Sequence, residues 1–244
     1  MSNIIEANKT ILPGTEEKED STKKVQPYVK FSFTITYILL LTTATITFIE
    51  ALRTKTPIVR DILNLETCIS IVAGYFYSVF VGKIDKYEEK GVNINWTEIT
   101  QTRYIDWSIT TPLMILTLCL VLGKEIGVPL HLPTFLMVVA LNYIMLFVGY
   151  LGETGVLSRI TADITGFAAF FAMFGIIFKT FVLPKYRWCN YVLYFIYLVI
   201  WSMYGFVYLL GDEYKNIATN ALDFIAKCFV GIGLWAYYTK IIRS

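Results

Sequence analysis

The chain has 244 residues, of which 56% are hydrophobic and only 16% are charged, and its formal net charge is +2. Because soluble domains carry about 25% charged residues, this composition excludes a disordered protein, a disulfide-rich scaffold and an ordinary cytosolic enzyme. It predicts a helical membrane protein with several spans, and so small a net charge gives no reason to expect a nucleic-acid partner. The four cysteines form no CxxC or Cys/His cluster, so no metal site is expected.

The predicted elements begin with residues 1–28, whose mixed charges indicate a solvated N-terminal tail with a short structured piece at Ile4–Ile11. No apolar core follows a basic segment there, so we expect no cleaved signal peptide. Residues 29–244 predict one domain of seven transmembrane helices, because a span needs about 20 mostly apolar residues. The predicted spans cover about residues 30–52, 62–83, 99–122, 131–152, 158–182, 188–211 and 214–241.

The loops between these spans differ in their content of lysine and arginine, which orients helical membrane proteins. The richer set of loops, with the C-terminal tail, holds Arg53, Lys55, Arg60, Lys124, Lys179, Lys185, Arg187, Lys240 and Arg243, and the poorer set holds Lys83, Lys86, Lys90, Arg159 and Lys215. We therefore expect the N-terminus outside and the C-terminus in the cytoplasm of an integral multi-pass protein in a plasma membrane or a host membrane.

Two pairs of charged residues lie in the middle of predicted spans. Arg103 and Asp106 share a face of the third span, and Asp223 and Lys227 share a face of the seventh, at spacings of three and four residues. A charge at the bilayer centre costs roughly 2.5–3.5 kcal/mol, so such residues need a reason to be there. The four could form a structural ion-pair network. Alternatively, Lys227 could be used chemically, because a desolvated lysine forms Schiff bases readily and a protonated imine needs carboxylate counter-ions.

Aromatic residues surround this charged group. Trp107 follows Asp106, and Trp201, Tyr204 and Tyr208 recur on one face of the sixth span. An aromatic stripe of this kind is usually ordinary core. Together with the lysine and its carboxylates, it predicts an apolar slot for a long, flat ligand that ends at the lysine.

Four sequence motifs carry a family resemblance. The third span reads RYIDWSITTPL at 103–113, the fourth reads NYIM at 142–145, the sixth reads WSMYG at 201–205, and the seventh reads DFIAK at 223–227. In this order they resemble microbial (type 1) rhodopsins, whose patterns are RYxDWxxTTPL, a polar residue three positions before a retinal-contacting Met, WSxYP and DxxxK. The resemblance extends over about residues 30–242. Those proteins are photoreceptors, pumps and channels, so we do not expect an enzyme.

The resemblance implies a seven-helix bundle with all-trans retinal buried at its centre and bound to Lys227 as a protonated Schiff base. It makes Asp106 the counter-ion and proton acceptor, Asp223 the second counter-ion, and Arg103 a residue that swings between the inner and outer halves. The retinal pocket that it implies consists of Trp107, Thr110, Thr111, Asn142, Met145, Gly149, Phe170, Trp201, Tyr204 and Tyr208.

One departure from the family pattern concerns proton supply. Outward proton pumps of this family usually have a carboxylate eleven residues after the counter-ion, about 16 Å further along the helix. Thr117 stands at that position, and a hydroxyl is a poor proton donor near neutral pH. Reprotonation of the Schiff base should then be slow unless another acid replaces the missing one, and Glu66 and Glu50 are candidates. Both could instead lie at helix ends and extend to the membrane surface.

Acidic residues in the first two spans are similar to those of channelrhodopsins, and the whole pattern resembles the first group of viral rhodopsins of large DNA viruses. That resemblance implies a light-gated cation channel, in which retinal isomerisation and Schiff-base deprotonation open a polar path through Glu50, Glu66 and Thr117 toward the lysine. The alternatives are an outward proton pump with slow reprotonation, a sensory rhodopsin that needs a transducer, and a seven-helix scaffold without retinal. The expected partners are lipid, monovalent cations or protons, and further copies of the chain in a homo-oligomer.

Overall fold

The computed structural model describes residues 13–239, and it describes side chains from residue 27 onward. The piece predicted at Ile4–Ile11 lies outside the described residues. Within the described range the secondary structure is helical throughout. The helices are α1 (Pro13–Arg53), α2 (Pro57–Glu89), α3 (Trp96–Ile126), α4 (Leu132–Glu153), α5 (Arg159–Phe181), α6 (Trp188–Tyr208), α7 (Asp212–Asp223), the π-helical segment η1 (Phe224–Phe229) and α8 (Val230–Tyr238).

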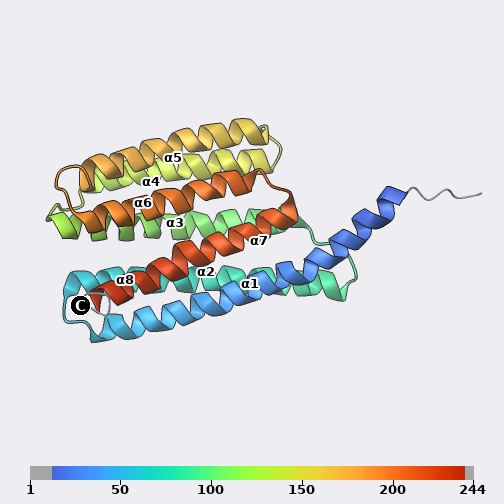
Figure 1. Ribbon diagram of the computed structural model, residues 1–244, viewed down its shortest axis with the longest axis horizontal. Coiled ribbons are helices and arrows are strands. Elements are labelled where there is room, and N and C mark those ends of the chain that lie inside the picture. The colour runs from blue at the N-terminus through green and yellow to red at the C-terminus, as the bar shows by residue number, and fades with distance from the viewer. Residues whose placement is uncertain (1–12, 240–244) are drawn as a thin grey trace, which may run out of the picture.

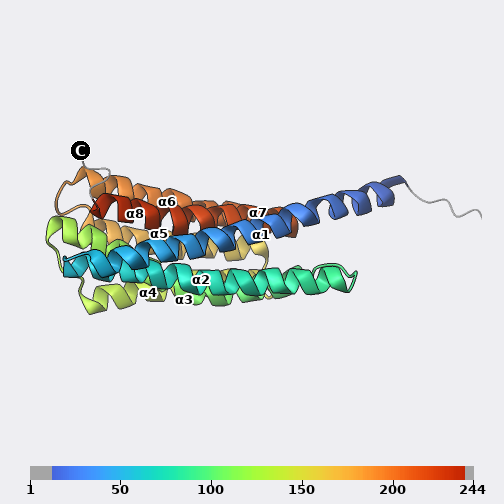
Figure 2. The same cartoon turned by 90° about the horizontal axis from the view of Figure 1, so that it is seen from below.

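Seven stretches of the described chain are long and apolar enough to cross a membrane, which confirms the predicted seven-helix membrane fold. The seventh consists of α7, η1 and α8 in succession. The first runs over Pro27–Arg53, although helix α1 itself begins earlier, at Pro13. In Figures 1 and 2 this early part of α1 projects beyond the other helices.

The helices lie side by side along one axis, so the bundle has two ends (Figures 1 and 2). What we call the C-terminal end contains the α1–α2, α3–α4 and α5–α6 connections and the end of α8. What we call the N-terminal end contains the α2–α3, α4–α5 and α6–α7 connections. Each helix therefore has a known direction relative to these ends, which places the residues of the site along the bundle axis.

Local sequence signals explain several helix boundaries. The Asn95 side chain accepts a hydrogen bond from the Glu98 amide at 3.2 Å and begins α3, and Ser158 does the same for Thr161 at the start of α5. Helix α3 ends at Gly127, whose φ of 74° is left-handed and favours glycine. These caps fix where α3 and α5 enter the bundle.

Buried threonines are compatible with the apolar interior because their hydroxyls bond back to their own helices. Thr43 donates to the Leu39 carbonyl at 2.9 Å, and Thr47 donates to the Thr43 carbonyl at the same distance. Thr110 donates to the Asp106 carbonyl at 3.0 Å. The threonine-rich first and third spans can therefore lie in a membrane without unpaired hydroxyls at these positions.

The bundle contains two large apolar clusters, one on each side of α3. One packs α3 against α4, α5 and α6, with Leu118 and Phe174 among its buried members, and the other packs α1 against α2, with Phe33 and Phe80. Large apolar side chains such as Phe147 are exposed on the outer faces of the helices, as expected for surfaces that contact lipid. The residues between the two clusters form the site described below.

A substitution at Gly123 would test how tightly side chains pack at the C-terminal end of the bundle. A Cβ atom at this position would lie 2.6 Å from the Val128 carbonyl oxygen and 3.5 Å from the Phe181 ring, whereas one at Gly175 on α5 would meet nothing within 4 Å. We expect Gly123→Ala to lower the free energy of unfolding by about 1–3 kcal/mol through overpacking. Gly175→Ala, the matched control, should leave it unchanged or raise it, since alanine favours helix. Thermal unfolding in detergent measures both, and equal midpoints for the two variants would contradict the prediction.

Candidate functional site

Lys227 is a buried lysine in the middle of the bundle. It lies in η1, where the helix is locally π-helical, and only 2% of the residue is exposed. Such single π turns are rare and occur frequently at functional sites. The amine is therefore held away from water by the fold, on a backbone segment that differs from the α-helix on either side.

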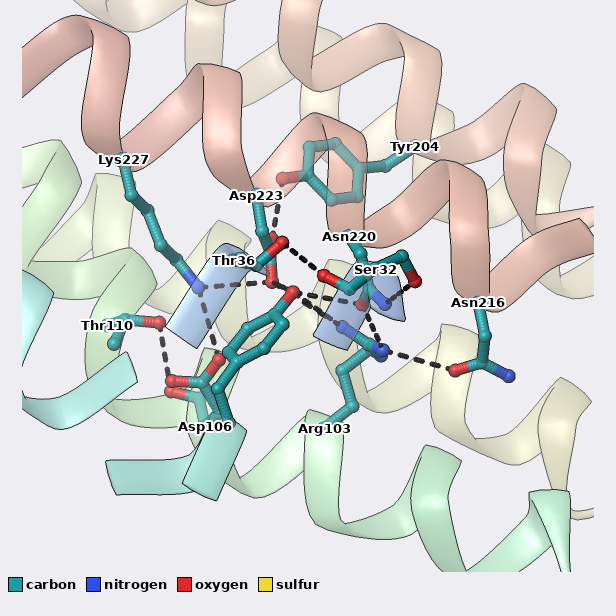
Figure 3. A network of polar contacts seen from close by, with 11 residues as sticks. Ser32, Thr36, Arg103, Asp106, Thr110, Tyr204, Asn216, Asn220, Asp223 and Lys227 are labelled. Carbon is teal, nitrogen blue, oxygen red and sulfur yellow. Dashed lines mark hydrogen bonds and ion pairs between the residues drawn. The ribbon is translucent and has the colours of Figure 1, made fainter. Parts of the chain in front are cut away.

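Two buried carboxylates face the Lys227 amine (Figure 3). Its Nζ lies 3.1 Å from Asp106 Oδ2 on α3 and 3.4 Å from Asp223 Oδ2 on α7. Neither aspartate is exposed. Because an unpaired charge in this environment is very costly, the three groups depend on one another for their burial.

The two carboxylates are held differently. Asp223 accepts hydrogen bonds from Tyr204 Oη at 2.7 Å and Tyr77 Oη at 2.8 Å, and Arg103 lies 3.5 Å away. Asp106 has the lysine as its partner, and its other oxygen, Oδ1, has no hydrogen-bond partner among the described residues. Asp223 therefore has several partners besides the lysine, whereas Asp106 keeps one oxygen without a partner among the described residues.

Arg103 occupies the N-terminal side of the lysine. Its guanidinium donates to Asn216 Oδ1 at 3.1 Å and Asn220 Oδ1 at 2.9 Å, as Figure 3 shows. It also lies over the Phe80 ring, 5.0 Å from its centroid. Asn220 in turn donates to Ser32 on α1 at 2.8 Å. The arginine thus connects α3 with α1, α2 and α7.

Sequence reasoning found the charged members of this network and missed the neutral ones. Asn216 and Asn220 precede Asp223 and Lys227 on the same face of the seventh span, because positions i, i+4, i+7 and i+11 align on a helix. That spacing could have identified both asparagines. Tyr77 carried no such signal, since it is one of several aromatic residues in an apolar span.

A cavity of about 140 Å³ reaches Lys227. Its walls include most of the pocket residues expected from the sequence, namely Trp107, Thr111, Met145, Gly149, Phe170, Trp201, Tyr204 and Tyr208. Thr110 and Asn142 are not among its walls. Thr110 donates to the Asp106 carbonyl of its own helix, whereas Asn142 donates to Oγ1 of the wall residue Thr111 at 2.8 Å. Tyr104, Met114 and Gly166 line the cavity and were not expected.

Glu66 is buried on the C-terminal side of the lysine. Only 2% of the residue is exposed, so the alternative that it extends to the membrane surface is wrong. It lies beside Thr117, and its Oε2 is 3.0 Å from where a Cβ of Gly231 would be. Gly231 follows Lys227 by one helical turn toward the C-terminal end. Glu66 and Arg103 are therefore on opposite sides of the lysine, whereas Glu50 is only half-buried.

An apolar layer separates Glu66 from the C-terminal end. Ile62, Val121 and Leu234 pack together, with exposures of 0%, 3% and 5%. These residues lie about one helical turn nearer the C-terminal end than the residues around the Glu66 carboxyl group. Ile62 precedes Glu66 by one turn on α2, and Val121 follows Thr117 by one turn on α3. The carboxyl group is thus closed off from water at that end by side chains from α2, α3 and α8.

Comparison with known proteins gives the family and the fold of the chain. The family model described as bacteriorhodopsin-like protein matches residues 28–241. The chain is similar to the crystal structure of viral rhodopsin OLPVRII, with 42% identity and a TM-score of 0.81 over 88% of this chain and 99% of that one. The structure of blue light-absorbing proteorhodopsin from Med12 shares the fold, with 22% identity and a TM-score of 0.68 over 89% and 99%.

A curated relative is also similar in sequence. The green-light absorbing proteorhodopsin of Gamma-proteobacterium EBAC31A08 is 30% identical over 159 residues. The match spans 58% of this chain and 62% of that protein, so it covers less than two thirds of the relative.

Tyr77 provides a test of the polar network. Tyr77→Phe removes the hydroxyl that donates to Asp223 and accepts from Arg103, and leaves both buried charges with one partner fewer. We expect the free energy of unfolding to fall by about 1–3 kcal/mol. Tyr37→Phe on α1 is the control, because its hydroxyl makes no hydrogen bond within the described chain. Chemical denaturation of the two variants compares them, and a loss no larger for Tyr77 than for Tyr37 would show that the network does not depend on this hydroxyl.

Proposed function

The chain belongs to the bacteriorhodopsin-like family of microbial rhodopsins, and we propose that it binds all-trans retinal on Lys227 and acts as a light-driven outward proton pump. Retinal, when bound, supplies absorption of visible light and a light-driven change of shape at the lysine nitrogen. The residues fit this group: a cavity with aromatic walls reaches Lys227, and two carboxylates lie beside the Lys227 Nζ.

The observation that carries the proposal is the position of Glu66. A pump needs a proton acceptor and a proton donor on opposite sides of the same nitrogen, with no open path between them. Asp106 is 3.1 Å from that nitrogen, and Arg103 lies on the same helix about one turn nearer the N-terminal end. Glu66 is buried on the other side and enclosed by the Ile62–Val121–Leu234 layer. It therefore supplies the acid that the sequence lacks at Thr117.

The proton path follows from this geometry. The proton on the Lys227 nitrogen passes to Asp106, whose Oδ1 has no competing partner among the described residues. Once Asp106 is neutral it attracts Arg103 less, and Arg103, which lies on the N-terminal side of Asp106, keeps Asp223 as its ion-pair partner. Glu66 then returns a proton to the nitrogen. Thr117 Oγ1 and Ser70 Oγ, both buried and without partners among the described residues, stand near this second step and suit bridging water.

The direction of transport rests on the orientation of the chain. The excess of lysine and arginine in the loops of the C-terminal end supports a cytoplasmic position for that end. Protons would then enter at Glu66 from the cytoplasm and leave beyond Arg103 to the outside. Assembly into a homo-oligomer within the lipid bilayer stays a prediction.

A light-gated cation channel is the second candidate. Buried polar residues lie on both sides of Lys227, as a conducting path requires, with Glu66 and Thr117 on one side and Arg103 on the other. For conduction the Ile62–Val121–Leu234 layer must separate, whereas a pump can work with this layer almost closed. The channel-type assignment therefore stays a prediction, as does the sensory alternative.

Voltage-clamp recording from cells supplied with retinal separates these functions. For a pump we expect a light-induced current that stays outward at every holding potential, because absorbed light, not the ion gradient, would drive the proton. Lys227→Ala, which removes the attachment atom, should abolish both the colour and the current. A current that reverses sign near a cation equilibrium potential would overturn the pump in favour of the channel. Pigment with a photocycle and no current would favour the sensor.

Glu66→Gln tests the donor directly. We expect the second proton transfer to slow by about 100-fold, a typical contribution of a positioned acid. Flash photolysis measures this rate as the recovery of the protonated pigment. Azide, a small weak acid, should restore the rate by delivering protons from solution. Glu50→Gln is the matched control. Because Glu50 is only half-buried, this substitution should leave the recovery rate unchanged. An unchanged recovery in Glu66→Gln would remove Glu66 from the donor role.

A further inference from the structure

A second group of charged residues lies at the N-terminal end of the bundle, where α4, α5 and α7 meet. Glu153 ends α4, and both of its carboxylate oxygens accept from Lys215 Nζ on α7, at 3.0 and 2.9 Å. The two side chains are only 7% and 8% exposed. This Glu153–Lys215 pair is therefore buried, although it lies near the end of the molecule.

Two further charges flank the pair on its solvent side. Arg159 lies 3.2 Å from Glu153 Oε2 and 3.4 Å from Asp212 Oδ1, and Asp212 lies 3.0 Å from Lys215. The side chains of Arg159 and Asp212 are 38% and 46% exposed. The exposed fraction of the side chains thus falls from Arg159 and Asp212 to Glu153 and Lys215. The four residues form a charge cluster that is exposed to solvent on one side and buried on the other. Tyr104 on α3 and Tyr208 on α6 also face Glu153, and Asp163 on α5 lies near these two tyrosines.

This charge cluster lies between two cavities. The cavity that reaches Lys227 and Arg103 extends to Glu153 and Lys215. A smaller cavity of about 40 Å³ is lined by Glu153, Arg159 and Asp212. Glu153 and Thr100 line both cavities. The Glu153–Lys215 pair therefore stands where the inner cavity ends, with a polar outer cavity beyond it.

Stability alone does not account for an ion pair at this position. The desolvation of two charges offsets much of their attraction, so a buried pair contributes little net stability compared with apolar packing. The same energetics make such a pair suitable as a barrier. It closes the wall while the site is dry, and it separates at low cost once water enters and hydrates both ions.

We propose that the Glu153–Lys215 pair is a gate between the cavity around Lys227 and the N-terminal end of the bundle. When the pair is closed, water and ions do not pass from the outer cavity to Arg103. When it separates, a proton that leaves the Arg103 side crosses to solvent. The identity of the transported ion rests on the proposed function, but the barrier itself does not.

The first test measures how readily hydroxylamine reaches the lysine in the dark. Hydroxylamine attacks the carbon of the bond between retinal and Lys227; the carbon–nitrogen bond to the lysine breaks, and retinal oxime and the free amine are formed, with loss of colour. We expect Lys215→Met to bleach several-fold faster than the unmodified protein, because the gate is open. Lys215→Arg, which keeps the charge, should restore slow bleaching.

The control breaks a more exposed ion pair at the same end. Lys83 Nζ lies 2.8 Å from Glu98 Oε1, and neither residue lines either of the two cavities. Lys83→Met should bleach at the unmodified rate. If Lys215→Met bleaches no faster than Lys83→Met, the proposal of a gate is overturned. The Glu153–Lys215 pair then only connects α4 with α7.

A second measurement needs no retinal and separates the gate from the proposed function. Thr219→Cys, in a background with the exposed Cys68 and Cys189 changed to serine, puts a thiol in the wall of the cavity that reaches Lys227 and not in the wall of the outer cavity. We expect a charged methanethiosulfonate reagent to label this thiol several-fold faster when Lys215→Met is added. An unchanged rate would overturn the gate. A failure of the protein to form pigment would instead contradict the proposed function and leave this measurement valid.

Discussion

The buried amine of Lys227 and its two carboxylates are the interaction on which the rest of the structure depends. A charge in a membrane interior requires compensation, and here Asp106 and Asp223 provide it at 3.1 and 3.4 Å. Compensating Asp223 in turn requires Tyr204, Tyr77 and Arg103. The need to satisfy each buried polar group thus extends the network from one lysine to five helices.

The network is asymmetric about the lysine, and this asymmetry is what could make proton movement directional. On the N-terminal side, polar groups continue from Arg103 through Asn216 to the charges around Glu153. On the C-terminal side, one carboxyl group, Glu66, is enclosed by apolar side chains. A proton on the polar side has many acceptors near it, whereas on the other side it has a single source. The family has several functions on this fold, so function depends on the placement of a few residues and not on the fold itself.

Much of this site could be predicted from the sequence, because helical periodicity places residues on a face without knowledge of the neighbours. Asp223 and Lys227 at i, i+4, and Arg103 and Asp106 at i, i+3, had to share faces once their spans were helical. The aromatic stripe on the sixth span followed from the same rule, and its three members line the cavity. Contacts between helices did not follow. Tyr77 meets Asp223 across 146 positions of the chain, and no local pattern encodes that pairing.

The sequence by itself determined the seven spans, the lysine with its counter-ions, and the family, since each depends on composition, periodicity or a contiguous motif. Only the tertiary structure decided the environments of Glu66 and Glu153. Both are single acids near helix ends in the sequence, where a carboxylate can equally extend into water. The packing of Ile62, Val121 and Leu234 buries the first, and Lys215 from another helix buries the second. Burial is a property of what surrounds a residue, and those surroundings come from segments far apart in the chain.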